Sequence, residues 1–133
     1  MRIESETYQT KLAKPASWEE CAFLYCTFSH IKSEGAHVTS VFVDCTIDNC
    51  DFYWGLFNVA TFVGVTLQNC TFRGTGIAGC RFVECRFDGC SFIQDNLGGS
   101  CSFDGTRWHG CEQSSTQGLD AGLVPRRRAP HHA

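Results

Sequence analysis

The sequence predicts an all-β solenoid, and three observations support this prediction. A large apolar residue recurs every five residues from Phe42 to Leu97, and all twelve of these positions are apolar. Cysteines stand two residues before such positions, and glycine or asparagine often stands two residues after them. Residues spaced five apart would be distributed around all faces of an α-helix, and along a straight strand they would alternate between its two faces. Only a chain that turns every five residues keeps the large residues on one inner side.

We call the large apolar residue of each repeat its centre. The segment Gly98-Gly99-Ser100 adds one residue, after which the pattern resumes at Phe103 and Trp108, and Phe23 and Phe28 follow the rule in an earlier register. With these two shifts allowed, all eleven phenylalanines are centres, and all ten cysteines lie two residues before a centre. Glycine and asparagine tolerate the backbone of tight turns, so apolar positions and turn positions repeat in phase.

The repeat over residues 21–113 resembles the pentapeptide repeat family, whose motif is a small residue, Asp or Asn, Leu or Phe, and two further residues. The small residue here is usually Cys, with Ala60 as a variant, and Asp51 and Asn96 fit the second position. The resemblance implies a right-handed, quadrilateral β-helix with four repeats in each coil, in which residues twenty apart stack. The expected inner columns are Phe42, Phe62, Phe82 and Phe103; Ile47, Leu67, Phe87 and Trp108; Phe52, Phe72 and Phe92; and Phe57, Ile77 and Leu97.

We expect three segments along the chain. Residues 1–20 are predicted to form a short N-terminal cap, in which the sequence Ser17-Trp18-Glu19-Glu20 after Pro15 favours a helical turn that lays Trp18 over the first coil. Residues 21–113 form the β-helix. Residues 114–133 contain turn formers and a basic triplet without periodicity, and are predicted to be a disordered, flexible tail. An uncapped C-terminal end then favours a homodimer, through that end or through an apolar flank. The competing possibility is that the tail folds back as a lid, which its arginine triplet and prolines make less favourable.

The cysteines are interpreted as small buried apolar residues. Zinc sites usually pair ligands two to four residues apart, and this chain has no C-x-x-C pair. We therefore expect reduced thiols and no metal or other cofactor. The resemblance stacks Cys50, Cys70, Cys90 and Cys111 in one column, where parallel side chains do not meet sulfur to sulfur.

The composition and motifs disfavour several classes of function but do not identify a specific one. A formal charge of −3 gives no reason to expect direct nucleic-acid binding, and the lack of a long apolar run argues against a membrane span. The polar N-terminus is unlike a secretory signal, so a cytoplasmic location is expected. No catalytic motif is present, which favours a non-enzyme. We expect a protein-interaction scaffold whose protein partner is unidentified. The alternative that the resemblance implies is a DNA mimic that binds a type II topoisomerase (gyrase) and protects it from inhibitors.

Residues beside each centre should point outward, and some of them are apolar. The candidate interface comprises a ridge of Val43, Val63 and Val83, a group of Tyr53, Trp54 and Leu56, then Ile93 stacked over Tyr53 with one coil between, and Trp108 at the last coil. Two interpretations stay open. These residues bind a partner, or they are covered within the protein by the first twenty residues or by a symmetric copy. Asp95 also has two readings, since it could cap the bulged turn at Gly98-Gly99-Ser100 or belong to a displayed binding loop.

Overall fold

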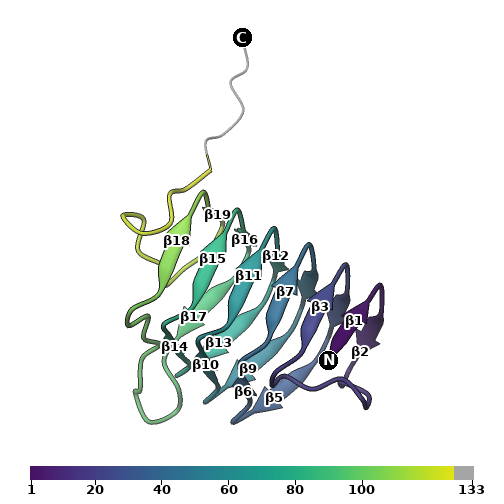
Figure 1. Ribbon diagram of the computed structural model, residues 1–133. Coiled ribbons are helices and arrows are strands. Elements are labelled where there is room, and N and C mark those ends of the chain that lie inside the picture. Colours follow the sequence, from purple (N-terminus) through teal and green to yellow (C-terminus); the bar gives the residue numbers. More distant parts are fainter. Residues whose placement is uncertain (128–133) are drawn as a thin grey trace.

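The computed structural model describes residues 1–127 as a four-sided parallel β-helix built from strands of two or three residues (Figure 1). Side A holds β1 (Arg2–Glu4), β3 (Ala22–Leu24), β7 (Val41–Val43), β11 (Thr61–Val63), β15 (Arg81–Val83) and β18 (Arg107–His109). Side B holds β2 (Thr7–Gln9), β4 (Thr27–Ser29), β8 (Thr46–Asp48), β12 (Thr66–Gln68), β16 (Arg86–Asp88) and β19 (Glu112–Ser114).

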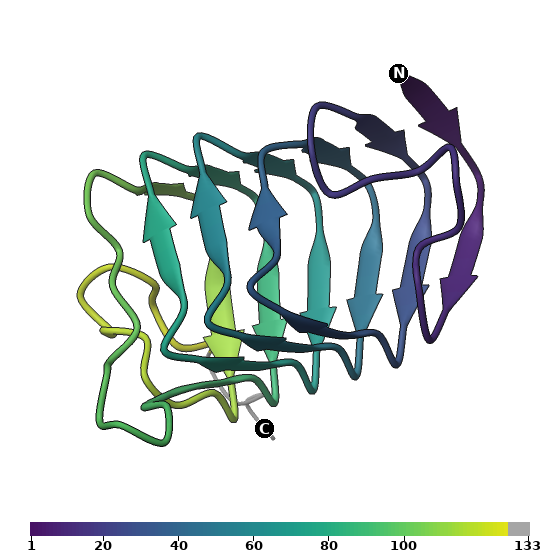
Figure 2. The same cartoon turned by 90° about the horizontal axis from the view of Figure 1, so that it is seen from below.

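The other two sides are shorter. Side C holds β5 (Lys32–Glu34), β9 (Asp51–Tyr53), β13 (Thr71–Arg73) and β17 (Ser91–Ile93), and side D holds β6 (His37–Val38), β10 (Leu56–Asn58) and β14 (Gly76–Ala78). Viewed from below, the coils form a stack with the N-terminus at one end (Figure 2). No helix among residues 1–127 is long and apolar enough to cross a membrane.

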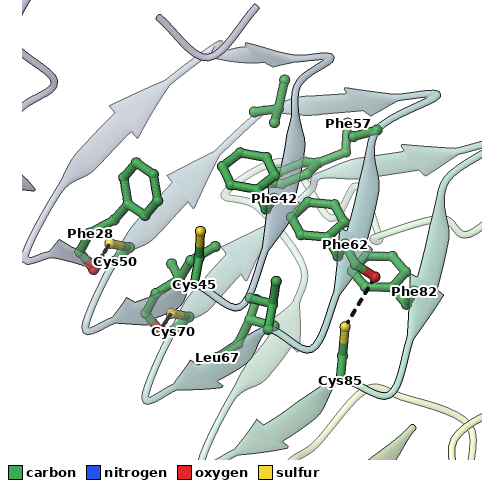
Figure 3. Close-up of a cluster of buried hydrophobic side chains, with 14 of the residues drawn as sticks. Phe28, Phe42, Cys45, Cys50, Phe57, Phe62, Leu67, Cys70, Phe82 and Cys85 are labelled. Atoms are coloured by element: carbon green, nitrogen blue, oxygen red, sulfur yellow. Dashed lines mark hydrogen bonds between the residues drawn. The ribbon is translucent and has the colours of Figure 1, made fainter. Parts of the chain in front are cut away.

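The phenylalanine centres form the core in the predicted register. Phe62 pairs with Phe42 below and Phe82 above, and its ring lies 4.8 Å and 4.6 Å from theirs with planes 4° from parallel. Figure 3 shows this column inside the coils. Repeating the same residue at the same position of each coil therefore produces a continuous aromatic stack, which is the expected arrangement of the first inner column.

The cysteines occupy the narrow inner positions and bond the coils to one another. Cys70 Sγ donates to the carbonyl of Ile47 at 3.3 Å, and Cys85 Sγ donates to that of Phe62 at 3.4 Å (Figure 3). Thr75 Oγ1 makes the same contact to Phe52, at 3.1 Å. All ten cysteines are free, and nine are buried. Burial raises the pKa of the Cys45 thiol to about 11, which keeps that thiol protonated as a donor.

The predicted register is wrong above residue 93. Trp108, not Phe103, stacks on Phe82, and Gln113 pairs with Phe87, a separation of twenty-six residues. Stacked residues are otherwise about twenty apart, so the insertion is one whole repeat plus one residue. Residues 94–100 leave the ladder and form hydrogen bonds among themselves. Leu97, expected in the fourth column, is 86% exposed. Ser102 forms an isolated parallel β-bridge with Gly76 of side D, so Phe103, the next residue, belongs to side D and not to the predicted column on side A.

The same shift changes the cysteine columns. The amide of Glu112 donates to the carbonyl of Cys85, so Cys111 lies over Cys85 and not over Cys90 as expected. Thr116 takes the place above Cys90, whose amide donates to Thr116 Oγ1 at 3.2 Å.

The ladder begins within the segment expected to be a cap. β1 pairs with β3 and β2 pairs with β4, so the first partial coil starts at Arg2. The predicted helical turn is absent from residues 15–20, where Ser17 Oγ instead accepts a hydrogen bond from the amide of Glu19. Trp18 nevertheless fills the space inside this end, and its ring lies 5.5 Å from Phe28 and 5.6 Å from Phe52.

Residues 116–127, here called the lid, fold over the last coil, which was expected to be open. The amide of Gln113 donates to Pro125 O at 2.9 Å, and the amide of Arg127 donates to Gln113 O at 2.8 Å. Val124 is fully buried and accepts a hydrogen bond from the side chain of Gln113. The expectation of an end-on dimer rested on an uncovered last coil, and the lid covers that coil. The part of the predicted tail at 128–133 lies outside the described residues.

The corners impose a left-handed backbone on residues of many types. Glycine and asparagine take this conformation readily, but Val59 also adopts it, with φ of 54° and 69% of its surface exposed. A β-branched side chain in this region is strained by about 1–2 kcal/mol. We predict that Val59→Asn raises the free energy of unfolding by about 1 kcal/mol, measured by urea denaturation.

Val41 is the matched control, because it is also exposed but lies in strand β7. Val41→Asn loses β-propensity and gains nothing at a turn, so we expect it to lower stability. Equal effects of the two substitutions would contradict the strain at Val59.

The lid gives a second prediction. Val124→Asp places a charge in a fully buried position and should lower the free energy of unfolding by at least about 2 kcal/mol. Its neighbour Leu123 is 47% exposed, so Leu123→Asp should change stability by less than about 0.5 kcal/mol. A lid that does not pack on the coil would make the two variants equal in thermal unfolding.

Candidate protein-binding surface

Tyr53, Trp54 and Leu56 meet at the corner between sides C and D. Tyr53 ends β9, Leu56 begins β10, and Trp54 lies in the turn between them with φ of 56°. The turn conformation points the indole away from the core, and Trp54 and Leu56 are 44% and 43% exposed. The ring of Tyr53 packs beside that of Trp54 with centroids 4.5 Å apart.

Asp95, two coils above, ties the loop of residues 94–100 to this corner. Trp54 Nε1 donates to Asp95 Oδ2 at 2.7 Å, and the amides of Leu97 and Gly99 each donate to Asp95 Oδ1 at 2.8 Å. These hydrogen bonds, from the Gly99 amide first and then from Trp54, hold the pKa of the Asp95 carboxyl below its usual value. The prediction that Asp95 caps the bulged turn is confirmed, and its bond to Trp54 was not foreseen.

Gly74 makes the connection between Trp54 and Asp95 sterically possible. It occupies the corner of the intervening coil with φ of 53°. A Cβ atom there would lie within 2.9 Å of Asp95 Cβ and closer still to its carboxylate. The absence of a side chain at this corner lets the carboxylate of one coil reach the indole two coils below.

The tied loop brings Leu97 to the same corner as Trp54. Asp95 accepts hydrogen bonds from the indole of Trp54 and from the backbone amide of Leu97, so the two residues lie on one part of the surface. We call Trp54, Leu56 and Leu97 the corner patch. Leu97 was not predicted as a surface residue because it fits the five-residue period. The adjacent Gly98-Gly99-Ser100 was the available sign that the period breaks there.

A shallow recess on side C adjoins the corner patch. Its lining residues are polar or charged apart from the ring of Tyr53, and they are Lys32, Ser33, Glu34, Asp51, Tyr53, Arg73 and Asn96. The amide of Asn96 donates to the hydroxyl of Tyr53 at 3.4 Å, which joins the recess to the loop. Asp51 Oδ1 is buried there without a hydrogen-bond partner among the described residues.

The remaining candidate residues lie elsewhere. Val43, Val63 and Val83 do stack as an outward ridge, but on side A. Ile93 lies above Arg73, which lies above Tyr53, so it belongs to side C near the corner patch. Trp108 is half-buried and stacks on Phe82 with ring centroids 4.7 Å apart, in the coil that the lid covers.

The described residues offer no arrangement for metal chemistry. Residues 1–127 contain no group of three or more His, Cys, Asp or Glu side chains placed to hold a metal ion. His37 Nδ1 lies 3.4 Å from a carboxylate oxygen of Glu19, and both side chains are about half exposed. The arrangement of exposed apolar side chains at the corner instead supports contact with another macromolecule.

No family model and no curated protein matches this sequence. The fold resembles that of a pentapeptide repeat protein, Rfr23, from the cyanobacterium Cyanothece 51142, with a TM-score of 0.62 and 11% identity over 86% of this chain and 82% of that one. QnrB1, a plasmid-mediated fluoroquinolone resistance protein, matches with a TM-score of 0.47 and 14% identity over 94% of this chain and 76% of that one. The five-residue repeat and the four-sided coils together show that this chain has the pentapeptide-repeat fold.

Proposed function

We propose that this protein is a non-catalytic scaffold that binds a partner protein through the corner patch. The observation that carries the proposal is the clustering of exposed apolar side chains. Of the eight large hydrophobic residues that are exposed in residues 1–127, Trp54, Leu56 and Leu97 gather at this one corner. Aromatic and aliphatic side chains exposed together are the usual centre of a protein-binding site.

The hydrogen bonds around Asp95 also support binding. A loop that must become ordered when a partner arrives loses affinity, whereas a loop held in place beforehand does not. Here Asp95 accepts bonds from Trp54, Leu97 and Gly99, which holds Leu97 in place although its side chain is in water. The charged recess on side C then supplies a polar rim beside an apolar centre.

The charge distribution does not favour the DNA-mimic alternative. Such a mimic needs regularly spaced acids on one face to imitate the phosphates of a duplex. Here Asp44 lies at the corner of sides A and B, Asp48 lies on side B, and Asp51 lies on side C. Along side B, Arg86 and Glu112 form an ion pair at 3.1 Å, which further breaks any acidic run.

Leu97→Asp is predicted to remove the partner. Leu97 is 86% exposed and takes no part in the hydrogen bonds of the loop through its side chain, so the fold should persist. A central apolar contact is worth at least about 2 kcal/mol, so proteins captured from an extract of the native cells should fall more than about tenfold. Quantitative mass spectrometry of the captured fraction measures this.

Leu123→Asp provides the control, because Leu123 is also exposed but lies in the lid. The proposal requires at least one protein that Leu123→Asp retains and Leu97→Asp loses. If every captured protein responds to both variants alike, the corner patch is not the binding site. DNA gyrase in the fraction that Leu97→Asp loses would identify the partner as the topoisomerase.

The pKa of Asp95 gives a pH prediction. A carboxyl whose pKa is lowered by folding stabilises the loop fully above its unfolded pKa of about 3.9 and loses that contribution as the pH falls through the lower folded value. The NMR signal of the Trp54 indole N–H should therefore stay constant from about pH 8 to pH 5 and move only in stronger acid. Asp95→Asn should abolish the movement, and a midpoint above pH 5 in the wild type would disprove the assignment.

A further inference from the structure

Side A differs from sides B and C in what it presents to solvent. The outward positions of sides B and C are mostly polar, for example Thr46 and Asp48, or Lys32 and Glu34. On side A the middle strands present six apolar side chains, namely Ala22, Leu24, Val41, Val43, Val63 and Val83. Parallel register places them in two adjacent columns. The strands that carry them, β3, β7, β11 and β15, lie side by side in Figure 1.

This surface remains accessible in the single chain. Val41 is 39% exposed and its five neighbours are partly exposed. Exposed apolar residues also flank the sheet at both corners, since Tyr25 is 63% and Val59 is 69% exposed. Parallel sheets with apolar faces are normally covered by another layer, and a flat apolar face of this kind requires a flat apolar partner.

We propose that a second copy of this chain covers side A, with a two-fold axis parallel to the stack of coils. This axis keeps each coil opposite its counterpart and exchanges the two outward columns. Val41 of one copy then faces Val43 of the other, Ala22 faces Leu24, and Thr61 faces Val63. The apolar middle of side A is therefore complementary to itself.

The charges at the edges of side A select this axis. In β15, Arg81 occupies the first column, while exposed Glu84 follows Val83 at the corner beside the second column. Exchanging the columns brings Arg81 of each copy toward Glu84 of the other. In β1, Arg2 and Glu4 occupy the two columns and also face each other across the axis. A two-fold axis along the strands would instead bring Arg2 toward Arg107, which repels.

The size of side A predicts a weak dimer. Strands about 4.8 Å apart and about 10 Å long give six levels an area on the order of 300 Å² in each copy. A total near 600 Å² lies below the 1,200–2,000 Å² of standard stable interfaces, as an order-of-magnitude guide. We therefore expect a reversible dimer with a dissociation constant of about 10 μM or weaker.

Sedimentation equilibrium from about 5 μM to 500 μM tests the proposal, over a range set by that expected affinity. The mass should rise with concentration from the 14.8 kDa of one chain toward twice that value. Val63→Lys places a charge in the middle of the interface and should keep the protein monomeric throughout. Leu97→Asp, which disrupts the corner patch, should leave the association unchanged, so the dimer and the proposed partner binding are separable. Thermal unfolding of each variant checks that it is folded.

A charge exchange tests the axis itself. Arg81→Glu and Glu84→Arg should each weaken association by about threefold or more, and the double variant should restore it. A monomer at all concentrations would overturn the proposal. So would a dimer that withstands Val63→Lys, or one in which the double variant is weaker than either single variant.

Discussion

Hydrogen bonding between successive coils is the interaction on which this structure depends. Each strand is only two or three residues long, and its hydrogen-bond partners lie in the coils above and below. The amide of Thr71, for example, donates to Cys50 O, and the amide of Ser91 donates to Cys70 O. Thiols and hydroxyls add a second set of bonds in the same direction, as when Cys70 Sγ donates to Ile47 O. A single coil therefore has little stability of its own.

The ends of the stack and the insertion follow from this dependence. A terminal coil lacks a neighbour on one side, and here other segments supply what the neighbour would have given. Trp18 fills the interior of the first complete coil, while the lid brings Pro125 and Arg127 into hydrogen bonds with Gln113. Gln113 occupies a centre position beneath the lid, and its side-chain amide donates to Val124 O. In the loop at 94–100, backbone amides also lack partners in a neighbouring coil. Asp95 accepts hydrogen bonds from two of them, those of Leu97 and Gly99.

The repeating coils could be predicted from the sequence. The loop at 94–100 and the lid, which interrupt or end the repeat, could not. The column through Phe42, Phe62 and Phe82 was predictable because identical environments select identical residues. The loop was not, because Leu97 satisfies the five-residue period while its backbone leaves the ladder. A lid was considered and not favoured, for a related reason. Val124 packs through one side chain in an aperiodic segment, and no spacing in the sequence signals such a contact. At the corner patch, Trp54 and Leu56 were predictable as outward residues, whereas the bond from Trp54 to Asp95 spans forty-one residues and depends on the loop.

The fold also separates structural constraint from surface specificity along the chain. Centres, small inner residues and corner residues must satisfy packing or backbone geometry in every coil, so they carry little information about a partner. Only the residues on either side of each centre are free to vary. On side B those residues are mainly polar, whereas on side A six of the eight at four successive levels are valine, leucine or alanine. Solvent alone would not select apolar residues at these positions, because β-branched polar Thr fits the same strands, as Thr46 and Thr66 show. The contrast between sides that share one backbone therefore supports the proposal that another surface covers side A, and it separates the apolar face of side A from the corner patch between sides C and D.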